Sequence, residues 1–270
     1  MSPASGEAPA LDALLAPLRD DPASSAVLCD VDGTLAPIVE RASDARVPAD
    51  TADLLGSLAR RYALVGCVSG RPAAEVRELV GRDELAYIGN HGYERLLPGD
   101  GEPTADPALS GHEDAAARFL GGDAGTALEA AGLRLEDKGP IRAVHWRGAR
   151  DERAAELRAR ELAARAQDAG LVVHWGRKVL EIRPPVEIDK GSAIAQLLRG
   201  ESIAAALYGG DDRTDVDAFR RLRELAAAGE LRAAVCIGIG SSEGPPEVTA
   251  EADAVVGGPG GFVDVLRMLE

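Results

Sequence analysis

Short apolar runs recur along the chain, and each of them is closed by turn-forming residues such as glycine, aspartate or serine. The first run is AVLC at 26–29, and it ends at Asp30. Runs of about 4–8 residues that end in such signals predict buried strands. The runs of this kind lie at 26–29, 63–68, 85–88, 204–208, 233–239 and 252–256.

Between these runs, the apolar residues recur with helical spacing. The segments with this spacing lie at 11–18, 50–61, 72–80, 190–198, 215–228 and 262–269. Pro72 suits the first position of its helix, and residues 1–10 are expected to form a frayed tail. Strands that alternate with helices predict an α/β fold with a parallel sheet and right-handed crossovers.

The middle of the chain has a different texture. Residues 95–112 are rich in Gly, Pro and Asp and are expected to form a hairpin or linker. The order that follows is helix, two strands, helix and two strands, at 113–131 (broken near Gly121-Gly122), 133–137, 141–147, 151–169, 171–175 and 178–183. This order predicts antiparallel pairs with helices on one face, hence a smaller α+β domain. We therefore predict a parallel domain at 1–110 and 185–270, with a second domain inserted at 111–184.

Composition narrows the possible partners. The net charge of −15 argues against binding to nucleic acid or to an anionic membrane. No apolar run approaches the ~20 residues of a membrane span, and the N-terminus lacks the features of a signal peptide. We expect a cytoplasmic monomer that acts on a small molecule. Cys29, Cys67 and Cys236 lie in apolar runs and are expected to be buried, reduced thiols.

The clearest candidate chemistry lies where the first apolar run ends. Asp30 and Asp32 would project together from the carboxyl edge of the sheet, where ligands of such folds bind. Two carboxylates so close repel each other unless a cation lies between them, and a divalent metal is the usual one. The alternative is an ordinary strand followed by an Asp-Gly turn.

Three other polar signals fall at strand ends or helix starts of the same predicted sheet. They are Ser69 in VSGR, Lys190 in DKG, and Asp211-Asp212 in GGDD. Each has a simpler alternative: Ser69 as a helix N-cap, Lys190 as a solvated surface lysine, and the aspartates as a turn with an N-cap. Any one of these signals alone is weak.

Together, and in this order, the four signals resemble the haloacid dehalogenase superfamily of phosphatases. That resemblance implies a Rossmann-like parallel core with an inserted α+β cap. Longer segments are similar to the trehalose-6-phosphate phosphatase branch: GNHGYE at 89–94, AVHWR at 143–147, KVLEIRP at 178–184 and GDDRTDVDAF at 210–219. Val216 departs from the acidic residue that many members have there. At 270 residues, the chain is too short to include the synthase domain that some members carry.

The resemblance implies a Mg²⁺-dependent phosphatase that hydrolyses trehalose 6-phosphate through an aspartyl-phosphate. Asp30 would be the nucleophile and Asp32 the general acid and base. Mg²⁺ would be held by the carboxylates of Asp30 and Asp211 and by the backbone carbonyl of Asp32. Asp212 and Asp215 would support the metal ligands. The phosphoryl group would lie against Gly33, Thr34, Ser69, Gly70, Arg71 and Lys190.

The resemblance also assigns the sugar to the inserted domain. Strand alternation puts Glu181 and Arg183 on one face, and His145 and Arg147 on one face. Lys178 would share the other face, with Leu180, unless the strand end bulges. Without the resemblance, a solvated outer face is the simpler interpretation.

Residues elsewhere in the chain complete the set of candidates. Asn90, His91 and Glu94 follow the third strand and are candidates to line the cleft, although His91 equally suits a turn. Trp146 and Trp175 are assigned to the domain core, with a platform for a sugar ring as the alternative.

Other functions remain open. The substrate could be another sugar phosphate, such as sucrose phosphate, a glycosyl-phosphoglycerate or a pseudo-disaccharide phosphate. A sugar phosphomutase would pass the phosphoryl group to a second sugar instead of to water. A non-catalytic sensor is disfavoured, because Asp30 and Asp32 are both present.

Overall fold

The structure is a computed structural model. It describes residues 7–39, 44–121, 124–176, 178–199, 202–241 and 244–270. The chain divides into two compact units, one comprising Met1–Thr104 and Ile188–Glu270 and the other Ala105–Glu187. The insertion was expected at 111–184, so the smaller unit begins six residues earlier and ends three residues later than expected.

The first unit is built on a mixed sheet with the strand order β12-β11-β10-β1-β2-β3-β4-β5. Its strands are β1 (Ser25–Cys29), β2 (Leu64–Val68), β3 (Ala86–Gly89), β4 (Glu94–Leu96), β5 (Thr104–Ala105), β10 (Ala205–Gly210), β11 (Ala233–Gly240) and β12 (Ala254–Gly257). The six strands from β12 to β3 pair in parallel, and β4 runs antiparallel to β3. The predicted α/β fold with a parallel sheet is confirmed.

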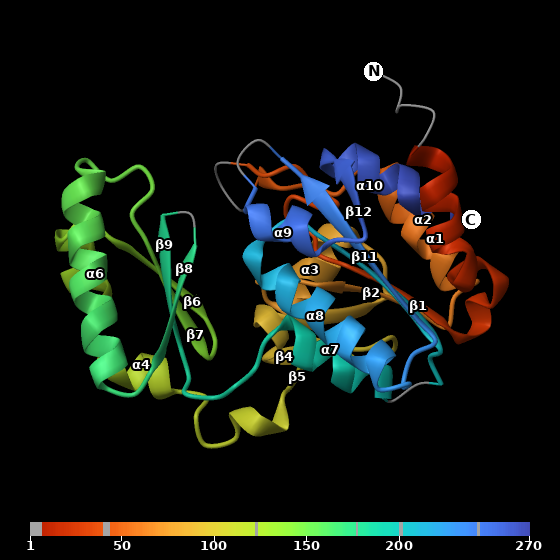
Figure 1. The fold of residues 1–270 in the computed structure, drawn as a ribbon. Helices are drawn as coiled ribbons and strands as arrows, with labels where there is room; N and C mark the ends of the chain where they lie inside the picture. The colour runs from red at the N-terminus through yellow and green to blue at the C-terminus, as the bar shows by residue number, and fades with distance from the viewer. Residues whose placement is uncertain (1–6, 40–43, 122–123, 177, 200–201, 242–243) are drawn as a thin grey trace. The chain divides into compact units, whose positions relative to one another are not determined.

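Helices cover both faces of this sheet (Figure 1). They are α1 (Glu7–Asp20), α2 (Ala49–Ala59), α3 (Ala73–Val80), α7 (Lys190–Arg199), α8 (Arg213–Ala227), α9 (Pro246–Glu251) and α10 (Gly258–Arg267), with short 3-10 helices η1 (Pro22–Ser24) and η3 (Asn90–Gly92). Val27 and Cys29 of β1 pack toward the side of α1, α2, α3 and α10, whereas Ala26 and Leu28 pack toward α7, α8 and α9. Burial on both faces explains why β1 is an unbroken apolar run.

Several boundaries differ from the predictions. The α9 helix was not predicted, and α10 begins at Gly258 instead of 262 because the segment GPGG, which suggests a loop, supplies the first turn of the helix. Proline is tolerated in that first turn. The α3 helix begins at Ala73, with Pro72 as its N-cap. The β10 strand extends through Gly209 and Gly210, so the glycines of GGDD belong to the sheet.

The second unit is an antiparallel sheet with the order β6-β7-β9-β8. Its elements are η4 (Pro107–Leu109), α4 (Ala115–Leu120), α5 (Ala124–Ala130), β6 (Arg134–Lys138), β7 (Ile141–His145), α6 (Glu152–Asp168), β8 (Val172–Gly176) and β9 (Val179–Arg183). Val144, Leu180 and Ile182 pack against α4 and α6 on one face and form the core of this unit. The predicted α+β insertion is therefore present.

The three cysteines, Cys29, Cys67 and Cys236, are free and buried, as expected. Among the described residues, none of the helices combines the length and the apolar character that crossing a membrane requires.

Candidate active site

Asp30 lies directly after β1, in the middle of the parallel sheet. Its backbone N–H donates to the carbonyl of Gly209 (2.9 Å), so the main chain of Asp30 continues the pairing of β1 with β10. The residue is only 5% exposed. The sheet thus fixes the backbone that carries this carboxylate.

Lys190 reaches Asp30 from the first residue of α7. Its Nζ donates to Oδ1 of Asp30 and to Oδ1 of Asp215, both at 2.7 Å. The side chain is 1% exposed, so the alternative of a solvated surface lysine is wrong. Burial would lower the pKa of Lys190, but the carboxylates of Asp215 and Asp30 hold that pKa well above its ordinary value.

Asp211 follows β10 and faces the loop after Asp30. Thr34 Oγ1 donates to Asp211 Oδ1 at 3.3 Å. Gly33 has φ +90°, and a Cβ at this position would lie 2.2 Å from Asp211 Oδ2. Glycine is needed at 33 both for its backbone conformation and for this close approach.

The carboxylates of Asp30, Asp211 and Asp215 form one buried cluster. One oxygen of each lies within 4.8 Å of the others. Burial and mutual repulsion raise the pKa of Asp30 well above its usual value, that of Asp211 to about 7 and that of Asp215 to about 6. Three carboxylates lie beside one ammonium group, so their ionised forms need further positive charge, and their hard oxygen donors fit Mg²⁺.

Asp215 ties this cluster together through four hydrogen bonds. Its Oδ1 accepts from Lys190 and from the hydroxyl of Tyr208 (2.7 Å). Its Oδ2 accepts from the backbone N–H groups of Asp211 and Asp212, both at 2.9 Å. Both oxygens are thus already used by the protein, which suits a supporting residue. Tyr208 was not predicted, because it looks like an ordinary strand residue.

Asp212 is the N-cap of α8. Its Oδ1 accepts from the backbone N–H and the hydroxyl of Thr214, at 2.7 and 2.6 Å. Burial acts against ionisation, but Lys190 and these hydrogen bonds hold the pKa of Asp212 below its usual range. The alternative interpretation as a turn and N-cap is therefore right for Asp212, whereas Asp211 belongs to the carboxylate cluster.

Asp32 is paired with Arg71. The guanidinium donates through Nε to Asp32 Oδ2 (2.6 Å) and through Nη2 to Asp32 Oδ1 (2.8 Å). Arg71 also bonds Glu75, one turn further along the chain, and its pKa is held well above its ordinary value chiefly by Asp32. The side chain of Asp32 is 36% exposed, in contrast to that of Asp30. Arg71, which was predicted to bind phosphate, thus orients the second carboxylate, and Glu75 was not predicted.

Ser69 lies at the end of β2 and does not cap a helix. Its Oγ accepts from the backbone N–H of Arg71 (3.2 Å), while Pro72 occupies the N-cap position of α3. Ser69 is 1% exposed. The hydroxyl remains able to donate, which is the property that a phosphate site requires.

The loop after β3 packs against this serine loop. Backbone N–H groups of Asn90 and His91 donate to the carbonyls of Arg71 (2.8 Å) and Ser69 (2.9 Å). A Cβ on Gly70 would lie 2.6 Å from the ring of His91, so the two loops are in contact. Glu94 accepts from the backbone N–H of Ala73 (2.7 Å) and from Asn90 Nδ2 (3.2 Å). Glu94 therefore bonds the first residue of α3 and the side chain of Asn90.

In the second unit, Glu181 is buried between two cations. Lys138 Nζ donates to its Oε1 at 3.0 Å, and Arg183 Nε donates to its Oε2 at 3.0 Å. Glu181 is 5% exposed and Arg183 7%, so neither lies on a solvated outer face. Lys138 was not predicted, because the strand was expected to end at 137.

His145 lies on the same face of this sheet. Its Nε2 is 2.6 Å from Glu136 Oε2, and Glu136 was also not predicted. The pairing of Glu136 with Ala143, and of Ala143 with Glu181, places these residues in one row across the sheet. Lys138, Glu136, His145, Glu181 and Arg183 therefore form a polar sheet face, opposite the apolar core of the unit.

Two predicted contacts lie outside the strands. The β7 strand ends at His145, so alternation does not place Arg147 on the face of His145, and Arg147 is exposed. Lys178 precedes β9 with φ +59°, and its Nζ donates to Glu152 Oε2 (2.6 Å) on α6. Trp146 is 6% exposed and belongs to the core, as predicted, whereas Trp175 is 40% exposed.

Known proteins resemble the chain over most of its length. The family model described as trehalose-phosphatase matches residues 28–251. A trehalose-phosphate phosphatase of Mycobacterium avium is 37% identical over 209 residues, covering 73% of this chain and 51% of that protein. An uncharacterized glycosyl hydrolase of Mycobacterium tuberculosis is 38% identical over 211 residues, covering 73% of this chain and 15% of that protein. The chain thus spans about half, or less, of the length of these relatives.

A solved structure shares the fold over most of the chain. The C-terminal domain of trehalose-6-phosphate phosphatase from C. albicans superposes with a TM-score of 0.79 and 22% identity, covering 96% of each chain. At that identity the likeness concerns the fold, whereas the match of the family model spans most of the sequence. The chain belongs to the trehalose-phosphatase family.

Proposed function

We propose that this protein is a Mg²⁺-dependent phosphatase that converts trehalose 6-phosphate to trehalose and phosphate. The observation that carries the proposal is the buried carboxylate of Asp30 at the end of β1, bonded to Lys190 and clustered with Asp211 and Asp215. The name of the Mycobacterium avium relative supports the choice of a trehalose phosphate as the substrate.

The first step is attack by Asp30 on phosphorus. One carboxylate oxygen of Asp30 forms the new P–O bond, the bond from phosphorus to the sugar oxygen breaks, and Asp32 gives that oxygen a proton. Asp32 then takes a proton from a water molecule that attacks the aspartyl-phosphate, which releases phosphate and restores Asp30. Lys190 and the Ser69 hydroxyl donate hydrogen bonds to the phosphoryl oxygens throughout.

Asp32 is suited to its two roles by its surroundings. Arg71 grips both of its oxygens, so the carboxylate has a fixed direction, yet a third of its surface is open to ligand and water. Asp30, in contrast, is buried, so few other nucleophiles can reach its position. The two carboxylates thus divide the work of nucleophile and proton carrier.

Mg²⁺ would be held by the carboxylates of Asp30 and Asp211 and by the backbone carbonyl of Asp32, with Asp212 and Asp215 behind them. When bound, it supplies positive charge that offsets the charge on the transferring phosphoryl group. Asp215 keeps Lys190 and the backbone of residues 211 and 212 in place for that purpose.

The polar sheet face of the second unit is the proposed sugar-binding surface. Glu181 is an acceptor for hydroxyls, and Lys138 and Arg183 are donors at hydrogen-bonding distance from it. Glu136 and His145 extend the same face. Asn90, His91 and Glu94, which belong to the first unit, are proposed separately as substrate contacts.

The test is phosphate release from a panel of sugar phosphates in the presence of Mg²⁺. We expect trehalose 6-phosphate to give the highest kcat/KM. A preference of about tenfold or more for sucrose phosphate, a glycosyl-phosphoglycerate or a pseudo-disaccharide phosphate would contradict the substrate. Formation of an isomeric sugar phosphate in place of free phosphate would identify a mutase.

A further inference from the structure

The second unit contains a hollow that the proposed reaction does not use. It is open to solvent, has a volume of about 580 Å³, and lies between α6 and the β8–β9 end of the sheet. Trp175, Trp146, Glu152, Glu156, Arg160 and Lys178 are among the residues that line it. This volume lies within the range of about 300–1,000 Å³ that is typical of small-molecule sites.

The hollow is on the opposite sheet face from Glu181. His174 pairs with Glu181 across β8 and β9, and Trp175 pairs with Leu180. Because side chains alternate between faces, Trp175 shares the helix-covered face with Leu180, and Glu181 lies on the other face. A ligand in the hollow therefore does not compete for the proposed sugar-binding surface.

An aromatic surface forms one wall. Trp146 is buried and meets Trp175 edge to face, with ring centroids 5.9 Å apart. Trp175 is 40% exposed, and the guanidinium carbon of Arg160 lies over its ring, 5.3 Å from the centroid. A large exposed indole held rigidly by a core residue is a flat surface on which a ring can stack.

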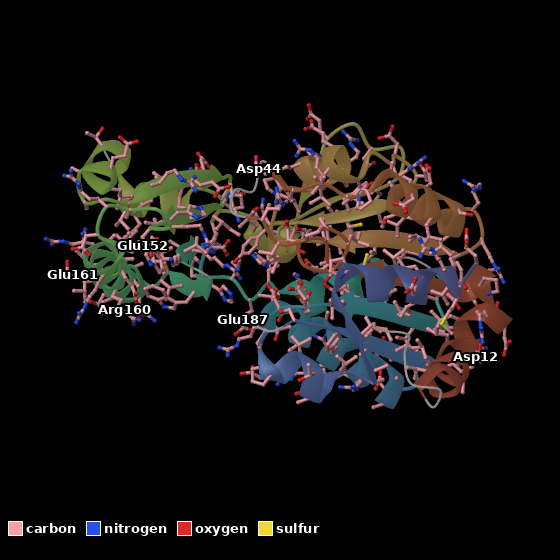
Figure 2. All side chains as sticks on the ribbon, turned by 90° about the horizontal axis from the view of Figure 1, so that it is seen from above. Asp12, Asp44, Glu152, Arg160, Glu161 and Glu187 are labelled. Carbon is pink, nitrogen blue, oxygen red and sulfur yellow. The ribbon has the colours of Figure 1, made fainter. Side chains whose placement is uncertain are left out.

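Paired charges form the rest of the lining. Lys178 Nζ bonds Glu152 Oε2 at 2.6 Å, and Arg160 Nη2 bonds Glu156 Oε1 at 2.6 Å. Figure 2 shows Glu152 and Arg160 projecting from α6. The ion pair of Arg160 with Glu156 is exposed and weak, and a cation–π contact at an exposed indole is weak as well, so moving the guanidinium off the indole costs little.

This lining suits a neutral ligand that is rich in hydroxyl groups. Each hydroxyl donates to a carboxylate and accepts from an ammonium or guanidinium, so it can insert into a charge pair without leaving either partner unsatisfied. A charged ligand would pair with the oppositely charged group of an ion pair and would leave the other group without its counter-charge. The C–H face of a pyranose ring is apolar and matches the indole.

We propose that this hollow binds a neutral carbohydrate, with a pyranose ring on Trp175 and its hydroxyls held by Glu152, Glu156 and Lys178. The site is separate from the phosphatase chemistry and stands whether or not trehalose 6-phosphate is the substrate.

Intrinsic fluorescence tests the proposal directly, because both tryptophans of the chain line the hollow. Trehalose and maltose, titrated separately into the full chain, should give a saturable change in tryptophan emission. Inorganic phosphate, as the charged probe, should give none. An equal response to phosphate would identify an anion site and overturn the proposal, as would the lack of any saturable response to either sugar.

Variants then locate the binding. Glu156→Gln should weaken sugar affinity by about fivefold, the effect of one weakened charged hydrogen bond. Glu161→Gln is the matched control, since Glu161 is also an exposed α6 carboxylate, is paired with Arg158 and does not line the hollow. It should leave affinity unchanged. Both variants should keep the phosphatase activity of the unmodified chain.

Trp175→Phe gives a second readout by saturation-transfer NMR, which does not depend on the indole. It should reduce transfer to the sugar C–H protons while the fold, followed by circular dichroism, is kept. Sugar binding that is equally strong in Glu156→Gln and Trp175→Phe would place the sugar elsewhere and overturn the assignment.

Discussion

Asp30 shows how a single side chain depends on its neighbours. It is buried, it accepts a hydrogen bond from Lys190, and its pKa is raised chiefly by desolvation and further by Asp215 and Asp211. Replacing its carboxylate by an amide keeps the shape but removes the negative charge and the nucleophile. Loss of the nucleophile is measured by turnover, and loss of the negative charge is measured by stability.

We expect Asp30→Asn to slow phosphate release by on the order of 10³-fold or more, because an amide does not form the acyl-phosphate. The fold should persist, since the backbone bond to Gly209 remains. Release of phosphate is measured with trehalose 6-phosphate, and mass spectrometry checks for deamidation back to Asp. Asp12→Asn, on an exposed carboxylate of α1, should retain full activity. Substantial turnover by intact Asp30→Asn would remove Asp30 from the proposed mechanism.

The carboxylate cluster as a whole gives a metal prediction. Chelator should remove activity, and Mg²⁺ should restore it and raise the Tm, because a cation that binds only the folded state stabilises it by mass action. Ca²⁺ should support activity poorly, since its coordination shell is larger and looser. Activity that survives excess chelator would be incompatible with the proposed metal requirement.

The sequence motifs predicted which residues form the site, but not which side chains surround them. The strand-end positions of Asp30, Ser69 and Asp211 follow from apolar runs and turn signals. The burial of Lys190 does not, because it depends on Asp215 and Tyr208, which other elements bring to it. The pairing of Arg71 with Asp32 likewise joins residues that are distant in sequence.

At the scale of elements, the loop after β1 is constrained by one glycine. Gly33 has φ +90° and lies against Asp211, whereas Gly81, at the C-terminal end of α3, has φ +71° and open space around it. The two glycines share the backbone conformation and differ in contact. Substituting each glycine by alanine therefore distinguishes the cost of backbone strain from the effect of displacing a carboxylate.

We expect Gly81→Ala to reduce the free energy of unfolding by about 1–2 kcal/mol and to leave kcat unchanged. Gly33→Ala should cost more and should also lose activity, because its methyl group displaces Asp211. Chemical denaturation and phosphate release measure the two effects. Equal activity in both variants would show that the position of Asp211 is not critical.

The polar face of the second sheet was foreseen only in part. Alternation predicts Glu181 and Arg183 on one face, but the partner Lys138 lies on a strand whose register with β7 is not encoded in local pattern. Pattern also fails for Arg147, which lies after the end of β7, and for Lys178, which lies before the start of β9. Strand ends depend on backbone pairing, which short windows of sequence do not determine.

Glu181→Gln should lower kcat/KM for trehalose 6-phosphate, because a charged acceptor for hydroxyls is lost. The expected loss corresponds to a rise of about 2–4 kcal/mol in the activation free energy. Hydrolysis of p-nitrophenyl phosphate should barely change, since that ester lacks the sugar. Glu181→Ala removes the carboxylate that both Lys138 and Arg183 bond, and should in addition destabilise the unit by about 3–5 kcal/mol. Equal losses with both substrates would make Glu181 structural or part of the chemistry.

At the scale of the whole molecule, a chain with a net charge of −15 is proposed to bind a phosphate ester. The attraction cannot come from its overall field, which repels anions. It must come from local positive charge, namely Lys190, Arg71 and the proposed Mg²⁺. The formal charge alone therefore gave no indication of an anionic substrate, whereas the motifs did.

The buried thiols of the larger unit can be used to measure how often its sheet opens. Cys29 and Cys67 are paired in register on adjacent strands, Cys236 lies on β11, and all three are almost completely inaccessible. A thiol reagent reaches them only when the sheet separates, so the labelling rate measures how often it does so. Labelling of Cys29, one residue before Asp30, should slow when Mg²⁺ is added, and mass spectrometry of each peptide would follow it. Ligand binding at the edge of the sheet could thus be timed in the unmodified protein, without any introduced probe.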